Sequence, residues 1–86
     1  MSYTVRLESR AERDLKRLSR DMLRRVDAKL LSLAKNPRPR GVRKLAGREG
    51  DGWRVRIGDH RILYTIDDDG QTVSVYRIRS RPTAYR

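Results

Sequence analysis

The feature that most constrains the fold is the segment 53–57, which reads WRVRI and alternates apolar with cationic side chains. A period of two is typical of a β-strand, because successive side chains of a strand point to opposite faces of the sheet. Arg54 and Arg56 must then point to one face while the apolar residues point to the other. The segment therefore predicts a sheet that buries one face and presents cations on the other.

Turn signals on both sides of the following apolar run extend this strand into a meander. Residues 58–59 (GD) predict a tight reversal, and residues 61–66 (RILYTI) alternate again, which places Arg61 on the cationic face. Residues 67–70 (DDDG) predict a second hairpin, and residues 72–79 (TVSVYRIR) predict a last strand. The apolar phase changes within that strand, so we expect a β-bulge or burial of both faces there.

The N-terminal half predicts one strand and two amphipathic helices. Residues 3–7 are rich in β-formers and predict a short strand that pairs with the sheet. Ser9 and Glu12 have the spacing of a capping box, so a helix is expected to begin there. A second helix should end before residues 36–37 (NP). The expected apolar stripes are Ala11, Leu15 and Leu18 in the first helix and Leu23, Val26, Leu30 and Leu33, widened by Met22 and Leu31, in the second.

These elements define the expected architecture. Residues 37–52 contain prolines and glycines that interrupt every period, and we expect a basic loop there. A chain of 86 residues has too little interior for two cores, so residues 1–86 are expected to form a single domain. The order of elements predicts an α+β fold, in which the N-terminal strand and a helical hairpin pack on one face of a mostly antiparallel sheet. The other face, with its arginines, stays open.

The composition points to a polyanionic partner. The chain has 22 Lys and Arg residues against 11 Asp and Glu residues, a formal net charge of +11, and such an excess suits nucleic acid, an anionic membrane or an acidic protein. The absence of cysteine excludes disulfides and thiolate metal sites. The sequence contains neither an apolar signal segment nor a run of about 18 apolar residues, so we expect a cytoplasmic protein that does not engage a membrane.

Arg54, Arg56 and Arg61 are the strongest candidates for a site. Like charges on neighbouring strands destabilise a sheet unless an anion neutralises them, and the planar guanidinium binds phosphate oxygens in a bidentate manner. His60 is the only histidine, but its parity directs it away from Arg61, which favours a surface or packing role. Residues 67–69 (DDD) lack the spacing of a divalent-cation loop. We expect neither a metal nor a cofactor.

A family resemblance covers nearly the whole chain. The run GWRVRIGDHRILYTIDDDGQTVSVYRIRSRPTAYR, preceded by KLAG at residues 44–47, resembles the C-terminal half of RelE-type toxins of bacterial toxin–antitoxin modules. The segment YTVRLESRAERDLKRL is similar to the N-terminal strand and first helix of that family. The resemblance implies a microbial-ribonuclease-like fold and an endoribonuclease that enters the ribosomal A site, cleaves mRNA there and inhibits translation. A cognate antitoxin restrains such a toxin.

Carried over by position, the resemblance assigns site residues in three parts of the chain. The basic pair of the family's second strand falls on Arg54 and Arg56, and the arginine that opens its third strand falls on Arg61. The arginine and tyrosine near the family's C-terminus fall on Arg81 and Tyr85. The resemblance implies that these five residues are catalytic. RNA binding is further expected at Arg43, Lys44 and Arg79.

The chain departs from many members of the family at two places. Its second strand carries arginines where those members have lysines, and Ser80 stands where many have a histidine. Arginine does not readily give up a proton, so Arg54 and Arg56 are expected to stabilise charge rather than to act as a base. The expected reaction is attack by the 2′-hydroxyl of the RNA itself without a metal, with fixed cations stabilising the phosphorane. The ribosome would supply the attack geometry, so we expect weak activity on free RNA.

Two other functions fit parts of the same sequence. Toxins of the ParE type, from the same superfamily, act on DNA gyrase and generally lack the arginine and tyrosine set, so the presence of Arg61, Arg81 and Tyr85 argues against that function. A non-catalytic nucleic-acid-binding module would need only basic charge and strand-borne aromatic residues such as Trp53 or Tyr76. For the RelE-type function, the expected partners are an acidic cognate antitoxin, the ribosome and mRNA.

Overall fold

The computed structural model describes residues 2–45 and 52–80. Within these ranges, neither helix combines the length and the apolar character that crossing a bilayer requires. The regular elements in chain order are β1 (Thr4–Leu7), α1 (Ser9–Lys16), α2 (Arg20–Lys35), β2 (Arg43–Lys44), β3 (Gly52–Ile57), β4 (His60–Asp67) and β5 (Thr72–Ser80).

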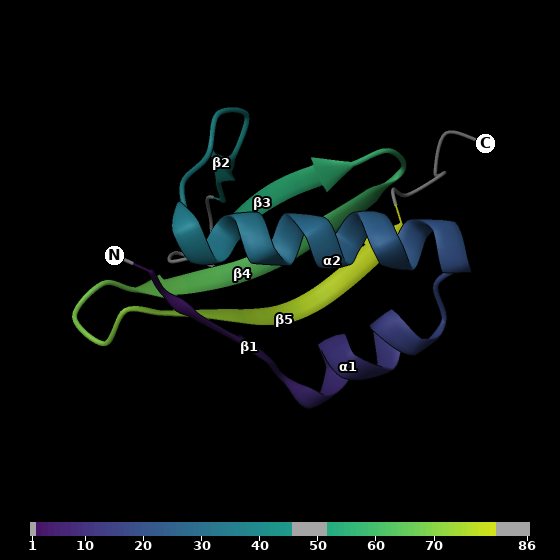
Figure 1. Ribbon diagram of the computed structural model, residues 1–86, viewed down its shortest axis with the longest axis horizontal. Coiled ribbons are helices and arrows are strands. Elements are labelled where there is room, and N and C mark those ends of the chain that lie inside the picture. Colours follow the sequence, from purple (N-terminus) through teal and green to yellow (C-terminus); the bar gives the residue numbers. More distant parts are fainter. Residues whose placement is uncertain (1, 46–51, 81–86) are drawn as a thin grey trace.

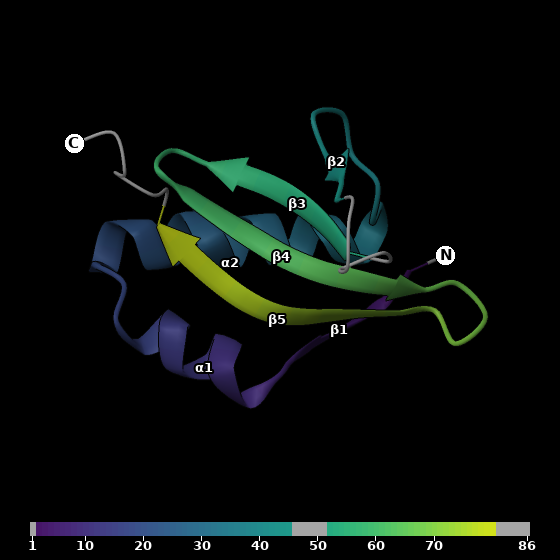
Figure 2. The same ribbon diagram turned by 180° about the vertical axis from the view of Figure 1, so that it is seen from behind.

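The strands form one sheet in the order β1-β5-β4-β3-β2. β1 runs parallel to β5, and the other neighbouring pairs are antiparallel. α2 crosses one face of the sheet, and α1 lies beside β5, beyond the end of β1 (Figure 1). Seen from behind, the opposite face of β3, β4 and β5 carries none of the described helices (Figure 2). The predicted α+β fold with a mostly antiparallel sheet and one open face is confirmed.

The strand register determines which side chains form the core. Val55, Ile62 and Ile78 are cross-strand partners in one row across β3, β4 and β5, and all three are buried. Directly opposed residues share a face, so parity puts this row, and the residues in phase with it, beneath α2. The buried core consists of Ala11, Val26, Leu30, Leu33, Val55, Ile57, Ile62, Tyr64, Val73, Val75 and Ile78.

The start of α1 agrees with the sequence, but its cap does not. The N-cap is Glu8, and no side chain caps the helix, so the predicted capping box of Ser9 and Glu12 is wrong. Ser9 is itself the first helical residue. A side chain caps the free N–H groups of the first turn from the residue that precedes the helix, and Ser9 lies one position too late for that. The extended backbone of Glu8 leads directly from β1 into the helix.

The bounds of α2 follow the prediction, and its buried stripe follows it in part. Its N-cap is Ser19, whose hydroxyl accepts a hydrogen bond from the backbone N–H of Met22 at 3.1 Å, and the helix ends at Lys35, before the proline, as predicted. Leu31 is 70% exposed, so the prediction that it widens the buried stripe is wrong. One residue beyond the buried Leu30, Leu31 is turned by more than a quarter of a helical turn away from the sheet.

The bulge predicted in the last strand is confirmed. The register shifts between Leu63 and Tyr64, whose partners are Arg77 and Val75 respectively, so Tyr76 is the extra residue in β5. A bulge lets a strand change the parity of its side chains. Apolar residues on both sides of the bulge therefore reach the same core.

A short strand forms where a loop was expected. In β2, Arg43 pairs with Arg54 and Lys44 pairs with Trp53. The expectation of a loop throughout residues 37–52 is wrong at these two positions and at Gly52, where β3 begins. The local sequence gives no strand signal there. The pairing satisfies backbone groups along β3, which would otherwise be a sheet edge with free N–H and C=O groups.

α1 closes the part of β5 that β1 leaves uncovered. β1 pairs with β5 only as far as Val75. Beyond it, Oδ2 of Asp14 accepts hydrogen bonds from the backbone N–H of Ile78 at 2.9 Å and from Nε of Arg77 at 2.8 Å, and Oδ1 accepts one from Nη2 of Arg77 at 3.2 Å. Burial acts to raise the pKa of Asp14, but these hydrogen bonds and the charges of Arg77 and Arg17 outweigh it and lower the pKa.

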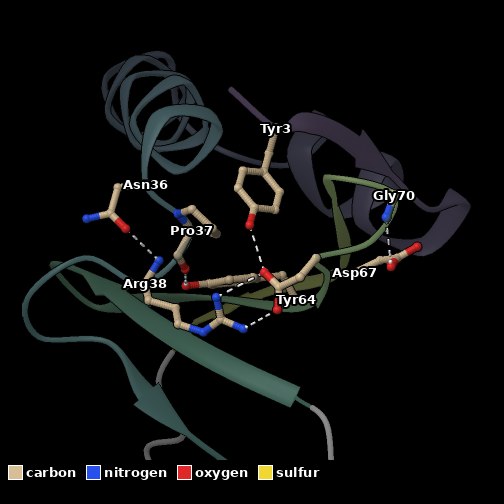
Figure 3. A network of polar contacts seen from close by, with 8 residues as sticks. Tyr3, Asn36, Pro37, Arg38, Tyr64, Asp67 and Gly70 are labelled. Carbon is tan, nitrogen blue, oxygen red and sulfur yellow. Dashed lines mark hydrogen bonds and ion pairs between the residues drawn. The ribbon is translucent and has the colours of Figure 1, made fainter. Parts of the chain in front are cut away.

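A polar network joins three segments near the turn between β4 and β5 (Figure 3). Arg38 donates two hydrogen bonds to Asp68, at 2.9 Å and 3.2 Å, and the hydroxyl of Tyr3 donates to the same carboxylate at 2.7 Å. These hydrogen bonds lower the pKa of Asp68 to about 2. The hydroxyl of the buried Tyr64 donates a hydrogen bond to the backbone carbonyl of Pro37 at 2.7 Å, and burial raises the pKa of Tyr64 to about 12.

We expect Asp68→Asn to lower the thermal unfolding midpoint by a few degrees at most near neutral pH, because the ion pair is exposed. Folding lowers the pKa of this carboxyl group from 3.8 to about 2. Such a group stabilises the fold fully at pH values above its pKa in the unfolded chain, and it loses that contribution as the pH falls through its pKa in the folded chain. The difference between variant and parent should therefore shrink steadily between about pH 4 and pH 2. Thermal scans across this range measure it, with Asp69→Asn in the same turn as the control. Equal pH profiles for the two variants would contradict the role of the network.

Candidate nucleic-acid interface

The open face of the sheet carries two rows of arginines. Across β3, β4 and β5, Arg56 pairs with Arg61, and Arg61 pairs with Arg79. Two residues earlier in β3, Arg54 pairs with Arg43 of β2. Neighbouring strands lie about 4.8 Å apart, and alternate residues of one strand lie about 6.6 Å apart. The rows are therefore adjacent, and we call these five residues, Arg43, Arg54, Arg56, Arg61 and Arg79, the arginine face.

The positive charge of the arginine face is not neutralised within the described chain. None of its members forms an ion pair with a described carboxylate. Burial, together with the neighbouring charges of Arg56, Arg61 and Arg43, lowers the pKa of Arg54. Nε of Arg61 is buried and has no hydrogen-bond partner among the described residues. Guanidinium groups that lie close together without an acidic neighbour favour the binding of an anion from outside.

A hollow of about 310 Å³ lies at the β2 side of the arginine face and is lined by Gly41, Arg43, Arg54 and Arg56. Gly41 has a φ of 90°, a conformation that glycine adopts at little cost. An added Cβ there would have no other atom within 4 Å, so the backbone of Gly41 borders open space. An anion in this hollow would meet guanidinium groups from two strands.

The structure brings most of the predicted site residues together. The parity argument placed Arg54, Arg56 and Arg61 on one face, and the strand register agrees. Two of the residues expected to bind RNA, Arg43 and Arg79, extend this group at its two ends. The group crosses four neighbouring strands of the sheet, from β2 to β5.

Of the other three predicted site residues, one does not join this group and two lie outside the described residues. Lys44 pairs with Trp53, and its Nζ lies 5.2 Å from the centroid of the Trp53 ring. Since neighbouring residues of a strand alternate between faces, Lys44 points away from the face that carries Arg43. Arg81 and Tyr85 lie outside the described residues.

His60 lies on the helix-covered side of the sheet. Its cross-strand partner is Ile57, which belongs to the buried core, so the prediction that His60 and Arg61 face opposite sides agrees with the register. Nδ1 of His60 is buried without a hydrogen-bond partner among the described residues. Over the same residues, no group of three or more His, Cys, Asp or Glu side chains is arranged to hold a metal ion.

The arginine face is suited to electrostatic rather than acid–base chemistry. Guanidinium groups in fixed positions can hold a phosphodiester and stabilise the negative charge that develops on a phosphorane. They remain protonated at any physiological pH and cannot accept a proton. The described cross-strand partners of these arginines include neither an imidazole nor a carboxylate. A reaction at this site therefore needs its proton acceptor from elsewhere.

A second cationic group was missed by sequence reasoning. Arg10, Arg13 and Arg17 border a hollow of about 130 Å³ together with Asp14 and Arg77. The spacing i, i+3, i+7 places the three arginines along one side of the helix, and this signal was available in the sequence. The contribution of Arg77 was not, because it depends on the bulge that redirects β5.

A family model described as the ParE toxin of the type II toxin–antitoxin system parDE matches residues 5–85. Toxin RelG of Mycobacterium tuberculosis is 37% identical to the chain over 90 residues, which cover 100% of this chain and 99% of the relative. The putative toxin RelE1 of Methanocaldococcus jannaschii is 29% identical over 89 residues, with 100% and 98% covered.

Solved structures of the same kind share the fold. The toxin–antitoxin complex RelBE2 of Mycobacterium tuberculosis contains a chain that superposes with a TM-score of 0.85 at 33% identity, covering 94% of this chain and 100% of that one. The archaeal RelE–RelB complex of Pyrococcus horikoshii gives a TM-score of 0.84 at 27% identity, with 96% and 99% covered. The similarity in both sequence and structure thus extends over nearly the whole length of the chains compared.

Proposed function

The chain belongs to the RelE/ParE superfamily of toxins from type II toxin–antitoxin systems, and on this premise we propose that it is a ribosome-dependent endoribonuclease that cleaves mRNA in the ribosomal A site. The observation that carries the proposal is the arginine face, in which Arg56, Arg61 and Arg79 form a row across three strands without a described carboxylate partner. A cationic sheet surface of this kind suits a phosphodiester strand laid across it.

The proposed reaction uses the nucleophile of the RNA. The 2′-oxygen attacks phosphorus, the bond from phosphorus to the 5′-oxygen breaks, and the products end in a 2′,3′-cyclic phosphate and a 5′-hydroxyl. Arg61, together with Arg81, would hold the non-bridging oxygens of the scissile phosphate. Arg54 and Arg56 would bind that phosphate or the flanking backbone. Each such fixed donor contributes about 10²–10³ to the rate of comparable reactions.

Proton transfer is the part that the arginines cannot perform. We assign to Tyr85, at the position of the family's C-terminal tyrosine, the role of contacting the 2′-hydroxyl and, as the phenolate that nearby guanidinium groups favour, of accepting its proton. The 5′-oxygen takes a proton from solvent or from a ribosomal group as it leaves. The in-line geometry comes from mRNA held in the ribosome, where orientation replaces much of the missing acid–base catalysis. Free RNA should be a poor substrate for this reason.

A cognate antitoxin completes the proposed system in the bacterial cytoplasm. The similar chains from Mycobacterium tuberculosis and Pyrococcus horikoshii were solved as toxin–antitoxin complexes. With a net charge of +11, this chain is expected to bind an acidic antitoxin that covers part of its cationic surface. Rim charges of such a complex are screened by salt.

One observation favours a different target. The matching family model is that of the ParE toxin, and toxins of that type act on DNA gyrase. Controlled expression in bacteria, followed by mapping of mRNA 5′ ends, separates the two functions. We expect new 5′ ends within translated codons soon after induction. Growth arrest with intact mRNA and damaged DNA would instead identify a gyrase poison.

A further inference from the structure

A second cationic groove runs along the junction of α1 and β5, at the edge of the sheet next to the arginine face. It consists of two hollows, of about 130 Å³ and about 290 Å³, that have Asp14, Arg17 and Arg77 in common. We call this the α1–β5 groove. Around Asp14 it is lined by Arg10, Arg13, Arg17, Arg77, Arg79 and His60.

The groove has a large excess of positive charge. Its one carboxylate, Asp14, is already occupied by Arg77 and by the backbone N–H of Ile78. Arg10, Arg13 and Arg17 are exposed and form no ion pair with a described residue. Like charges at this helical spacing repel one another. The fold therefore maintains unneutralised guanidinium groups at this place, and an anion bound there would relieve the repulsion.

The groove is continuous with the arginine face. Arg79 belongs to the row formed with Arg56 and Arg61, and it also lines the larger hollow. His60 lines the same hollow, and its buried Nδ1 lacks a hydrogen-bond partner among the described residues. The two surfaces thus share Arg79, and an RNA backbone that leaves the row of arginines would next meet the guanidinium groups of the groove.

We propose that the α1–β5 groove is a second RNA-phosphate site, which holds the backbone of the same RNA strand after that strand has crossed the arginine face. The inference rests on the proposed function in that it takes RNA to be the polyanion. A flexible single strand can bend around the edge of the sheet from one site to the other. The apolar residues of α1 do not favour a membrane instead, because Ala11 and Leu15 pack into the core.

The test is equilibrium binding of uncleavable RNA to the full chain, measured by fluorescence anisotropy. Two 2′-O-methyl oligonucleotides are used, a tetranucleotide that covers the arginine face alone and a dodecanucleotide that reaches the groove. We expect Arg13→Glu to weaken binding of the dodecanucleotide about tenfold and to leave binding of the tetranucleotide nearly unaffected. The salt dependence of dodecanucleotide binding should also decrease, because the slope of log K against log salt concentration becomes smaller by about 0.7 per lost phosphate contact.

Lys35→Glu is the matched control, because it makes the same change in charge at the far end of α2. Its effect on either oligonucleotide should be small, since charges are screened beyond about 10 Å at 0.1 M salt. Equal effects of the two variants on the dodecanucleotide would overturn the proposal. So would a larger loss of binding to polyglutamate than to RNA, which would assign the groove to an acidic protein.

The outcome is independent of catalysis. Arg61→Ala should weaken both oligonucleotides, because both cross the arginine face. If the chain fails to cleave mRNA on ribosomes but Arg13→Glu still acts on the long oligonucleotide alone, the groove stands and the nuclease function falls. If the chain cleaves mRNA on ribosomes but Arg13→Glu acts equally on the short and the long oligonucleotide, the nuclease function stands and the groove falls.

Discussion

Arg61→Ala is expected to slow single-turnover cleavage of mRNA on programmed ribosomes by about 10²–10³, the usual effect of removing one fixed donor from a developing oxyanion. Arg61 is central in its row, between Arg56 and Arg79, and its buried Nε has no described partner. The side chain lies on the open face, so truncation leaves no cavity in the core. The unfolding midpoint should stay at or above that of the parent, because repulsion within the row decreases.

Arg6→Ala is the control for Arg61→Ala. Arg6 is an exposed arginine that pairs with Ser74 at the β1 edge of the same sheet face, away from the arginine row. The Arg6→Ala variant should cleave mRNA at nearly the parental rate. Parental cleavage by Arg61→Ala, or loss of its fold, would contradict the site assignment.

Tyr85→Phe is expected to slow the same single-turnover reaction by about 10²–10⁴, the range that a positioned acid or base contributes. The substitution keeps the ring and removes only the hydroxyl. Affinity for the ribosome, measured by cosedimentation, should therefore change little, so that the loss appears in the rate constant and not in binding. Tyr3→Phe, which also removes a single phenol but one bonded to Asp68, should cleave as the parent does.

Parental cleavage by Tyr85→Phe would mean that the phenol does not take the proton. A ribosomal group or solvent would then be the acceptor, and the chain would contribute electrostatic stabilisation alone. The arginine face would still be required in that case. The two substitutions thus separate charge stabilisation from proton transfer.

The parts of the fold that follow from period and parity were predictable from the sequence. The alternation from Trp53 to Ile57 gave the two-faced strand, and the change of phase near Tyr76 gave the bulge. The parts that depend on distant partners were not. β2 has no local strand signal and forms because β3 offers a free edge. Leu31 is apolar and was expected to be buried, but it lies on the outer side of α2.

The candidate site shows the same division. Parity sufficed to put Arg54, Arg56 and Arg61 on one face, because side-chain direction along a strand alternates strictly. It gave no information on Lys44, whose direction depends on pairing within a segment expected to be a loop. The link between Asp14 and Arg77 joins residues 63 positions apart, and no local pattern predicts such a contact.

The central claim is that the arginine face cleaves mRNA on the ribosome. In the most direct measurement, the purified full chain is added to ribosomes programmed with a defined mRNA, and primer extension locates the cleavage sites. The same mRNA free in solution and a gyrase supercoiling assay are tested in parallel. We predict cuts within the A-site codon that leave a 5′-hydroxyl, little cleavage of the free mRNA, and unaffected gyrase. Inhibition of gyrase with intact mRNA on the ribosome would contradict the claim.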